Sequence, residues 1–234
     1  MVEDSWTIPD VAVAVDLAVL TVRDEALQIM LVERGIEPYA GMLALPGGFL
    51  FDDAEDIDVA AARELSEETG LTPAVLHLEQ LRTYGAPGRD PRRRVISICY
   101  LAFVPDLPDP VAGGDARRAA WTPVKKALEG SAEVAFDHVR IIQDAVERAR
   151  SKIEYTTLAA SFCPAEFTMT DLRRIYEIIW GQQLDPRNFH RKITSVTDFL
   201  VPTGERTTRY GGRPAALYRC GPATLLHPAL LRAR

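Results

Sequence analysis

The chain has 234 residues, enough for one large domain or two small ones, and its 47% hydrophobic and 26% charged content is typical of a globular protein. Its most apolar run, residues 11–22, is interrupted by Asp16, so a membrane span is excluded. The first residues lack the basic start and apolar core of a secretory signal. Cys99, Cys163 and Cys220 are too widely spaced for a zinc site or a disulfide framework. We therefore expect a cytoplasmic protein with no membrane partner and with reduced cysteines in its core.

Charge is distributed unevenly along the chain, whose net charge is −6. Residues 1–156 carry 16 Lys and Arg against 27 Asp and Glu, whereas residues 157–234 carry 11 against 6. An acidic part followed by a basic part is typical of a catalytic or sensing domain joined to a nucleic-acid-binding domain. We accordingly expect two domains, at residues 1–155 and 156–234.

Hydrophobic patterning predicts mostly β-structure in the first domain. Two β-rich runs, residues 11–22 and 26–33, flank the polar residues 23–25 and predict a hairpin. Further strands are expected at residues 74–84, 94–104 and 118–122, and a long amphipathic helix at residues 133–152. Within that helix His138 follows Asp137, which suggests catalysis. A lone histidine beside a core stripe is more often structural, and that is the interpretation we favour.

The segment from Gly47 to Leu71 contains the residues most indicative of chemistry. Its second half predicts a helix of three to four turns, which buries Ala60, Ala61 and Leu65. Gly70 stands where a left-handed C-terminal cap is expected. The glycine pair that leads into this helix can present backbone N–H groups to phosphate.

Three carboxylates share one face of the predicted helix. Glu64, Glu67 and Glu68 fall at positions i, i+3 and i+4, where like charges repel one another. Mg²⁺ relieves such repulsion, because it takes carboxylate oxygens together with water and substrate phosphates. The alternative is a solvated acidic helix face, which is the commoner role of an isolated charge cluster.

Arginines supply candidate contacts for an anionic ligand. The loop at residues 85–93 is rich in turn formers and arginine, and the alternative is that these charges are only solvated. The candidate ligand-binding residues are Arg34, Gly47, Gly48, Arg63, Arg89 and Arg92.

Two short helices are predicted in the basic domain. Thr168 and Asp171 form a capping pattern before a helix that ends at Gly181. Asp185 and Pro186 are a favourable N-cap and first residue for the next helix. The first helix has an apolar stripe of Leu172, Ile175, Tyr176 and Ile179, and the second has one of Phe189, Ile193 and Val196.

The polar faces of this domain predict binding of double-stranded DNA. A tight turn between two helices, followed by two strands at residues 199–208 and 214–219, is typical of a helix-turn-helix with a basic wing. One alternative is that the charges only solvate a small domain. Single-stranded RNA is a weaker alternative, because no pair of exposed stacking aromatics lies on a strand. The candidate DNA-binding residues are Arg187, Asn188, His190, Arg191, Lys192, Arg206, Arg209 and Arg213.

From Glu55 onward the acidic segment resembles the Nudix box, a glutamate followed after seven residues by Arg-Glu-Leu-x-Glu-Glu-x-Gly-Leu, here residues 63–71. One departure is that six residues separate Gly48 from Glu55, whereas the box normally has five. Because this loop sets where Gly48 lies relative to the carboxylates, we expect ligand binding to survive and catalytic geometry to be lost.

The whole chain resembles the Nudix-related transcriptional regulators of NAD metabolism, the NrtR family. The resemblance is carried by residues 45–49 with the box, residues 185–192 and residues 211–218. It implies an α/β fold, in which a Nudix α/β/α sandwich precedes a winged helix-turn-helix domain. It also implies a homodimeric repressor of NAD biosynthesis or salvage genes. ADP-ribose or a related NAD-derived pyrophosphate would occupy the Nudix pocket and release operator DNA, often without being hydrolysed.

Two other functions stay open. The first is an active Mg²⁺-dependent hydrolase of ADP-ribose, in which Glu64 or Glu68 orients or deprotonates water while the metal polarises the diphosphate. The second is a DNA-binding scaffold, whose Nudix domain serves only for dimerisation. Ligand titration separates these functions, because only the hydrolase turns the ligand over and only the sensor couples ligand to DNA affinity.

Overall fold

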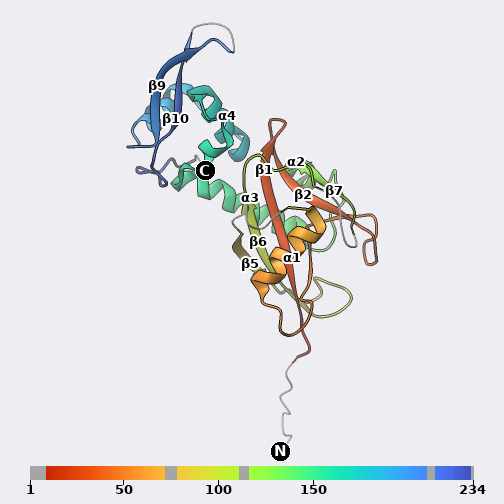
Figure 1. The fold of residues 1–234 in the computed structure, drawn as a ribbon. Coiled ribbons are helices and arrows are strands. Elements are labelled where there is room, and N and C mark those ends of the chain that lie inside the picture. The colour runs from red at the N-terminus through yellow and green to blue at the C-terminus, as the bar shows by residue number, and fades with distance from the viewer. Residues whose placement is uncertain (1–8, 72–77, 111–115, 210–213, 233–234) are drawn as a thin grey trace, which may run out of the picture. The chain divides into compact units, whose positions relative to one another are not determined.

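The computed structural model describes residues 9–71, 78–110, 116–209 and 214–232 and separates into two compact units (Figure 1). Unit 1 holds the described residues up to Val19 together with Ile29–Ala102 and Pro108–Gln143. Unit 2 holds Leu20–Gln28, Phe103–Leu107 and the described residues from Asp144 onward.

The larger sheet has seven strands among the described residues. Its order is β3-β2-β1-β6-β5, with β4 paired to β1 and β7 paired to β2. The strands are β1 (Ala12–Arg23), β2 (Ala26–Arg34), β3 (Leu43–Ala44), β4 (Gly47–Phe49), β5 (Glu79–Tyr84), β6 (Val95–Phe103) and β7 (Ala116–Pro123). The predicted hairpin of β1 and β2 is confirmed. The apolar run in β1 is buried on both faces, which explains why it reads as continuous rather than alternating.

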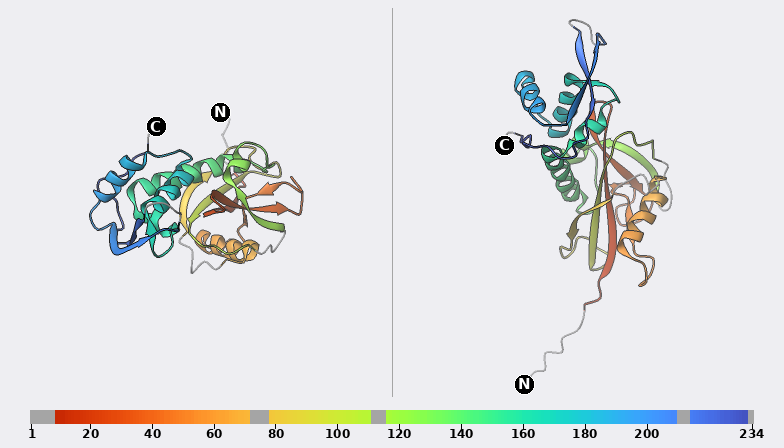
Figure 2. Two further views of the ribbon diagram at one scale, coloured as in Figure 1. Left: turned by 90° about the horizontal axis from the view of Figure 1, so that it is seen from above. Right: turned by 60° about the vertical axis from the view of Figure 1, so that its left-hand side comes forward.

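Helix α1 (Ile57–Thr69) carries the Nudix-box carboxylates. The Asp56 side chain caps its N-terminus, and Gly70 closes it in the left-handed conformation at φ 69°. Ala60, Ala61 and Leu65 are fully buried, which confirms the predicted apolar stripe. In Figures 1 and 2, α1 covers one face of the sheet, whereas the first turns of α3 lie on the other side.

Helix α3 (His138–Tyr155) begins five residues later than the sequence predicted. The residues before it are used by the sheet, since Leu43 forms a parallel bridge with Val134 and exchanges backbone hydrogen bonds with Glu133 and Ala135. Phe136 then takes a positive φ of 54°, which interrupts a right-handed helix. The short helix α2 (Val124–Leu128) comes earlier in the chain.

Unit 2 contains the predicted helix pair. They are α4 (Met169–Trp180) and α5 (Pro186–Thr194), which follow a 3₁₀ segment, η2 (Thr157–Phe162). Thr168 and Asp171 form the predicted capping box, and Gly181 ends α4 at φ 69°. The Asp185 side chain accepts a hydrogen bond of 2.7 Å from the Asn188 N–H and caps α5. The predicted end of α4 and start of α5 are therefore confirmed, whereas Val196, predicted on the second helix, lies beyond its last residue, Thr194.

A small sheet accompanies these helices. Its order is β8 (Phe167–Thr168), β10 (Ala215–Cys220), β9 (Leu200–Thr207), and α4 contacts α5, β8 and β10 (Figure 2). Phe189, Ile193 and Val196 are buried as predicted. In the apolar stripe of α4, Leu172, Tyr176 and Ile179 are buried and Ile175 is half-buried. This is the helix-turn-helix and wing that the sequence predicted.

The three cysteines are free, but they do not share one environment. Cys99 is buried, Cys163 is half-buried and Cys220 is exposed at the end of β10. The prediction that all three lie in the core is therefore wrong for Cys220. Over the described ranges, the structure contains no helix with the length and apolar character that a membrane crossing requires.

Candidate ligand pocket and DNA-binding surface

Unit 1 contains a cavity of about 460 Å³ beside the box helix. It is lined by Val32, Arg34, Gly35, Ile36, Ala44, Leu45, Gly47, Gly48, Phe49, Glu64, Glu67, Glu68 and Arg92. An adjoining space of about 60 Å³ shares several of these residues and also reaches Arg89 and Phe136. The structure thus brings together all three predicted carboxylates and all predicted ligand residues except Arg63, which lines neither space.

The glycine pair is held directly against the box carboxylates. The Gly47 N–H donates a hydrogen bond of 2.9 Å to Glu68 Oε2, and a Cβ at Gly48 would collide with the Glu64 carboxylate. A Cβ at Gly47 would overlap the backbone carbonyl of Val15, and its φ of 151° further disfavours any side chain. Only glycine fits this close approach of strand β4 to helix and sheet.

Arg63, predicted as a ligand contact, instead binds the carboxylates of its own motif. Its Nε and Nη2 donate to the two oxygens of Glu55 at 2.8 and 3.0 Å. Its Nη1 donates to Glu64 at 2.7 Å and to Glu67 at 3.1 Å, while Nη2 also reaches the Phe49 carbonyl at 3.1 Å. The bidentate pairing lowers the pKa of Glu55. Arg63 therefore positions the acidic residues rather than facing the cavity.

The longer loop between Gly48 and Glu55 leaves the glycine pair in contact with the box carboxylates. Glu55 still reaches Arg63, and it also accepts a hydrogen bond of 2.6 Å from the Phe51 N–H. The extra length is accommodated at the surface, where Phe51 is 82% exposed. Gly48 lies against the Glu64 carboxylate despite the longer loop, and the loss of catalytic geometry stays a prediction.

The three carboxylates are of the ligand type that Mg²⁺ takes, but their side chains are not arranged around one metal position. Glu64 is buried, and this desolvation raises its pKa even though Arg63 opposes the effect. A cation would relieve that cost, and carboxylate oxygens are the ligands that Mg²⁺ takes. Within the described part of the chain, no three acidic, histidine or cysteine side chains already converge on a metal position. Arg63 holds one oxygen each of Glu64 and Glu67, and the Gly47 N–H holds one oxygen of Glu68, so a cation would share or displace these contacts.

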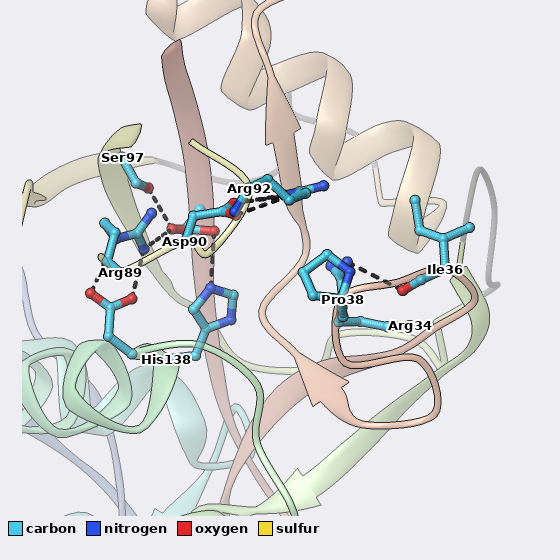
Figure 3. Close-up of polar contacts among 10 residues, drawn as sticks. Arg34, Ile36, Pro38, Arg89, Asp90, Arg92, Ser97 and His138 are labelled. Carbon is cyan, nitrogen blue, oxygen red and sulfur yellow. Dashed lines mark hydrogen bonds and ion pairs between the residues drawn. The ribbon is translucent and has the colours of Figure 1, made fainter. Parts of the chain in front are cut away.

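Two arginines and two aromatic rings lie beside the cavity. The Arg34 guanidinium lies 4.7 Å from the centre of the Phe136 ring, and that of Arg92 lies 5.3 Å from Phe49 and 5.9 Å from Phe136. Asp90 orients Arg92 through an ion pair of 2.7 Å (Figure 3). Guanidinium groups and aromatic faces side by side can bind phosphate and stack on a planar base.

A buried polar network lies beneath these groups. The Arg89 guanidinium, whose side chain is only 6% exposed, donates to Asp137 at 2.7 and 3.1 Å and to Asp16 at 3.2 Å. Ser97 also donates to Asp16, and the His138 Nε2 lies 3.5 Å from it (Figure 3). Arg89, predicted as a ligand contact, is thus already engaged by two carboxylates. Sequence reasoning missed Ser97 and gave Asp16 no role, although an isolated Asp within an apolar strand was a usable signal.

His138 connects this network to the glycine loop. Its Nδ1 accepts a hydrogen bond of 2.9 Å from the Leu45 N–H, and the ring is buried. Burial lowers the pKa of His138, because the charged imidazolium is disfavoured away from water. This burial and this hydrogen bond are consistent with the structural role that we favour for His138.

The predicted DNA-binding side chains of α5 lie opposite its buried stripe. Arg187, Asn188, His190 and Arg191 are exposed, and Lys192 is half-buried. Arg191 donates to the Asn188 Oδ1 at 2.6 Å, which places the two side chains together.

The wing carries two of its three predicted arginines within the described residues. Arg206 and Arg209 are exposed, and Arg206 donates to the Pro214 carbonyl at 2.7 Å. Arg213 lies outside the described residues.

A Nudix-box pocket and a winged helix on one chain define a two-part protein, a Nudix-related regulator. Residues 12–145 match the family model of the NUDIX domain, and residues 159–220 match that of the NrtR DNA-binding winged helix domain. The chain belongs to the NrtR family of Nudix-related transcriptional regulators.

Two regulators resemble nearly the whole chain. The ADPR responsive transcriptional repressor NtrR of Acinetobacter baylyi is 33% identical over 212 residues, which is 90% of this chain and 82% of that protein. Shewanella oneidensis NrtR, solved with a 27mer DNA, is 30% identical, covers 90% of this chain and 94% of its own, and has a TM-score of 0.68. Its NUDIX domain, solved with ADP ribose, is 29% identical at a TM-score of 0.56 and covers 61% of this chain and 90% of its own.

An enzyme resembles the Nudix part alone. The ADP-ribose pyrophosphatase of Methanocaldococcus jannaschii is 41% identical over 117 residues, which is 50% of this chain and 64% of that protein.

Proposed function

We propose that this protein is a transcriptional repressor that binds operator DNA through its winged helix and releases it when ADP-ribose, or a related NAD-derived pyrophosphate, occupies the Nudix pocket. The observation that carries the proposal is the presence, on one chain, of an acidic pocket with phosphate-binding groups and of an exposed basic helix. The regulated genes would be those of NAD biosynthesis or salvage. This function places the protein in the cytoplasm, with DNA.

The pocket offers groups for the diphosphate and the adenine of ADP-ribose. Arg34 and Arg92 supply guanidinium donors for the diphosphate, and Phe49 and Phe136 supply aromatic faces for the adenine. Glu64, Glu67 and Glu68 would hold Mg²⁺, which neutralises phosphate charge when bound. ADP-ribose would thus find charge and stacking partners in the cavity and the space that adjoins it.

On the DNA side, α5 is the element that enters the major groove. Arg187 and Arg191 suit the acceptor edge of guanine, and Asn188 suits adenine. The wing arginines Arg206 and Arg209 suit the phosphate backbone. One winged helix covers few base pairs, so we propose a homodimer on a palindromic operator. Light scattering that gives the mass of one 25.9 kDa chain in the free protein, and one chain per operator in the complex, would exclude the dimer.

Fluorescence anisotropy on a labelled operator tests the proposed function directly. Specific binding at fixed salt should weaken as ADP-ribose is added with Mg²⁺. AMP, which lacks the diphosphate, serves as the matched ligand control and should have less effect. Operator affinity that is the same at zero and saturating ADP-ribose would refute the sensor for that ligand.

A second candidate function is Mg²⁺-dependent hydrolysis of ADP-ribose. It is favoured by the Glu55–Arg63 pairing, which survives the longer loop, and by the identity with the archaeal pyrophosphatase. The similarity of the whole chain to repressors weighs against it. In this function Glu64 or Glu68 would orient or deprotonate the attacking water. Release of AMP that depends on Mg²⁺ and disappears in Glu68→Gln would establish the enzyme.

A further inference from the structure

We infer that His138 is a positioning residue, which ties the ligand-binding glycine loop to the first turn of α3 and makes that helix responsive to the occupancy of the pocket. The inference rests on the proposed function, because it concerns how the same pocket is connected to the rest of the chain. It concerns the four-residue segment Leu45–Gly48, called here the glycine loop, and the helix α3 that starts at His138.

The imidazole is held in one orientation by partners on both ring nitrogens. Nδ1 accepts from the Leu45 N–H at 2.9 Å, so the proton of the neutral ring lies on Nε2. Nε2 faces Asp16 Oδ1 at 3.5 Å, and Asp16 is itself held by Ser97 and Arg89. The hydrogen bond at Nδ1 sets the tautomer, and the Asp16 carboxylate attracts the Nε2 proton across a longer, electrostatic contact. The position of the Leu45 N–H is thereby fixed as well.

Three backbone groups of the glycine loop are bonded to three different elements. The Leu45 N–H bonds to α3, the Pro46 carbonyl accepts from the Leu17 N–H of β1 at 2.8 Å, and the Gly47 N–H bonds to Glu68 of α1. A ligand or metal that takes Glu68 away from Gly47 removes one of these three restraints. A shift of the Gly47 backbone would then move Leu45, two residues away, and the His138 ring that accepts its hydrogen bond.

A second pocket segment converges on the same turn of α3. Arg89 binds Asp137, immediately before the helix, with two hydrogen bonds. Arg92, three residues after Arg89, lines the cavity. The glycine loop is therefore bonded to His138, and the arginine loop, residues 85–93, is bonded to Asp137. No other turn of α3 has hydrogen bonds to both loops among the described contacts.

The later turns of α3, in unit 2, are bonded to α4. The Trp180 Nε1 donates to the Arg150 carbonyl at 3.2 Å, and the Tyr176 hydroxyl donates to the Ile153 carbonyl at 3.2 Å. Tyr176 also packs edge-on against Phe189 of α5, with ring centres 5.4 Å apart. One continuous helix thus carries contacts to the pocket loops at its start and contacts to the helix-turn-helix near its end. This continuity gives a physical route from pocket to DNA-binding helix.

Substitutions of His138 by asparagine and glutamine separate the contributions of its two ring nitrogens. In His138→Asn the side-chain oxygen can take the place of Nδ1 and accept from Leu45, whereas in His138→Gln the longer amide can replace Nε2 toward Asp16. His138→Leu removes both contacts. His227→Leu, at an exposed histidine, is the control.

The readout is the factor by which ADP-ribose weakens operator affinity. We expect wild type and His227→Leu to show a factor of about 5 to 150, the usual range of coupling between two sites. The factor should fall toward one in His138→Leu and His138→Gln and be largely retained in His138→Asn. DNA affinity without ligand should stay unchanged in all four variants, which a general loss of structure would not allow.

Three results would overturn the role proposed for His138. A folded His138→Leu with the wild-type factor overturns the inference and leaves the proposed function standing. A wild type that does not respond to ADP-ribose overturns both. If His138→Leu does not fold, ¹⁵N spectroscopy of the wild type replaces it: ligand should change the His138 ring-nitrogen shifts and the exchange rate of the Leu45 amide. Unchanged signals at saturating ADP-ribose would overturn the inference.

Discussion

The backbone N–H of Gly47 donates a hydrogen bond of 2.9 Å to the Glu68 carboxylate, so the glycine loop is held by a side chain that the metal would need. The two roles compete, because a carboxylate oxygen engaged with a cation is a weaker acceptor for an amide. Binding of metal and diphosphate would free this N–H to face a phosphate instead. Ligand binding in this pocket would therefore replace the hydrogen bond between Gly47 and Glu68.

Glu68→Gln tests this competition. The amide keeps an oxygen acceptor for Gly47 but loses the charge, so the melting temperature should change by less than about 3 °C, the shift of roughly 1 kcal/mol in a chain of this size. Mg²⁺-dependent ADP-ribose affinity should fall about tenfold or more. Calorimetric titration measures this ADP-ribose affinity, and Glu129→Gln, a substitution at an exposed residue, is the control. Equal affinity in both variants would remove Glu68 from the site.

Gly47→Ala should destabilise unit 1 strongly. The added Cβ meets the Val15 carbonyl, a backbone atom that cannot move away, and we expect a loss of about 3 kcal/mol or more. Gly41→Ala is the matched control: Gly41 also has a positive φ, 84°, but has no neighbouring atom within 4 Å. Gly41→Ala should lower the free energy of unfolding by about 1 kcal/mol. Urea unfolding compares the two, and similar losses would contradict the close packing of β4.

Arg191→Ala should weaken operator binding by about 1–3 kcal/mol if the side chain contacts a base. The effect should be smaller on non-specific DNA, because a base contact carries sequence information. Arg148→Ala, exposed on α3, is the control. Native circular dichroism must accompany each measurement. Wild-type operator affinity in both Arg187→Ala and Arg191→Ala would exclude α5 from the interface.

Stability should fall as the pH is lowered below about 6.5, the ordinary pKa of histidine. Burial lowers the pKa of His138 in the folded protein, while nearby Asp16 and Asp137 oppose the effect. The unfolded chain therefore binds the proton first, and stability present above pH 6.5 is lost as the pH falls toward the folded-state pKa. His138→Asn should show a shallower decline in urea unfolding between pH 7.5 and 5.5. Parallel profiles would contradict the neutral, buried ring.

Local sequence signals predicted most of the fold. The apolar stripe of Ala60, Ala61 and Leu65, the left-handed caps and the Asp185 N-cap follow from rules that act over one or two helical turns. The start of α3 was missed because a long-range bridge between Leu43 and Val134 outweighs the helical pattern of the preceding residues.

The sequence predicted most of the residues that line the cavity, but it did not predict what several of them contact. The box carboxylates line one cavity, yet the partners of Arg63 and Arg89 were not foreseen, because an arginine in a motif or a loop gives no sign of which carboxylate it will meet. The roles of Asp16 and Ser97 depend on strand pairing between distant segments. The contacts within the longer loop were not foreseen: Glu55 accepts a hydrogen bond from the Phe51 N–H, and Phe51 is exposed.

The most direct test of the account is reciprocity between the two sites. Operator affinity is measured by anisotropy with and without saturating ADP-ribose, and ADP-ribose affinity by calorimetry with and without saturating operator, at one Mg²⁺ and salt concentration. If pocket and DNA-binding helix share one coupling free energy, both affinities must fall by the same factor, about 5- to 150-fold. Equal affinities with and without the second ligand, in both directions, would contradict the repressor that senses ADP-ribose.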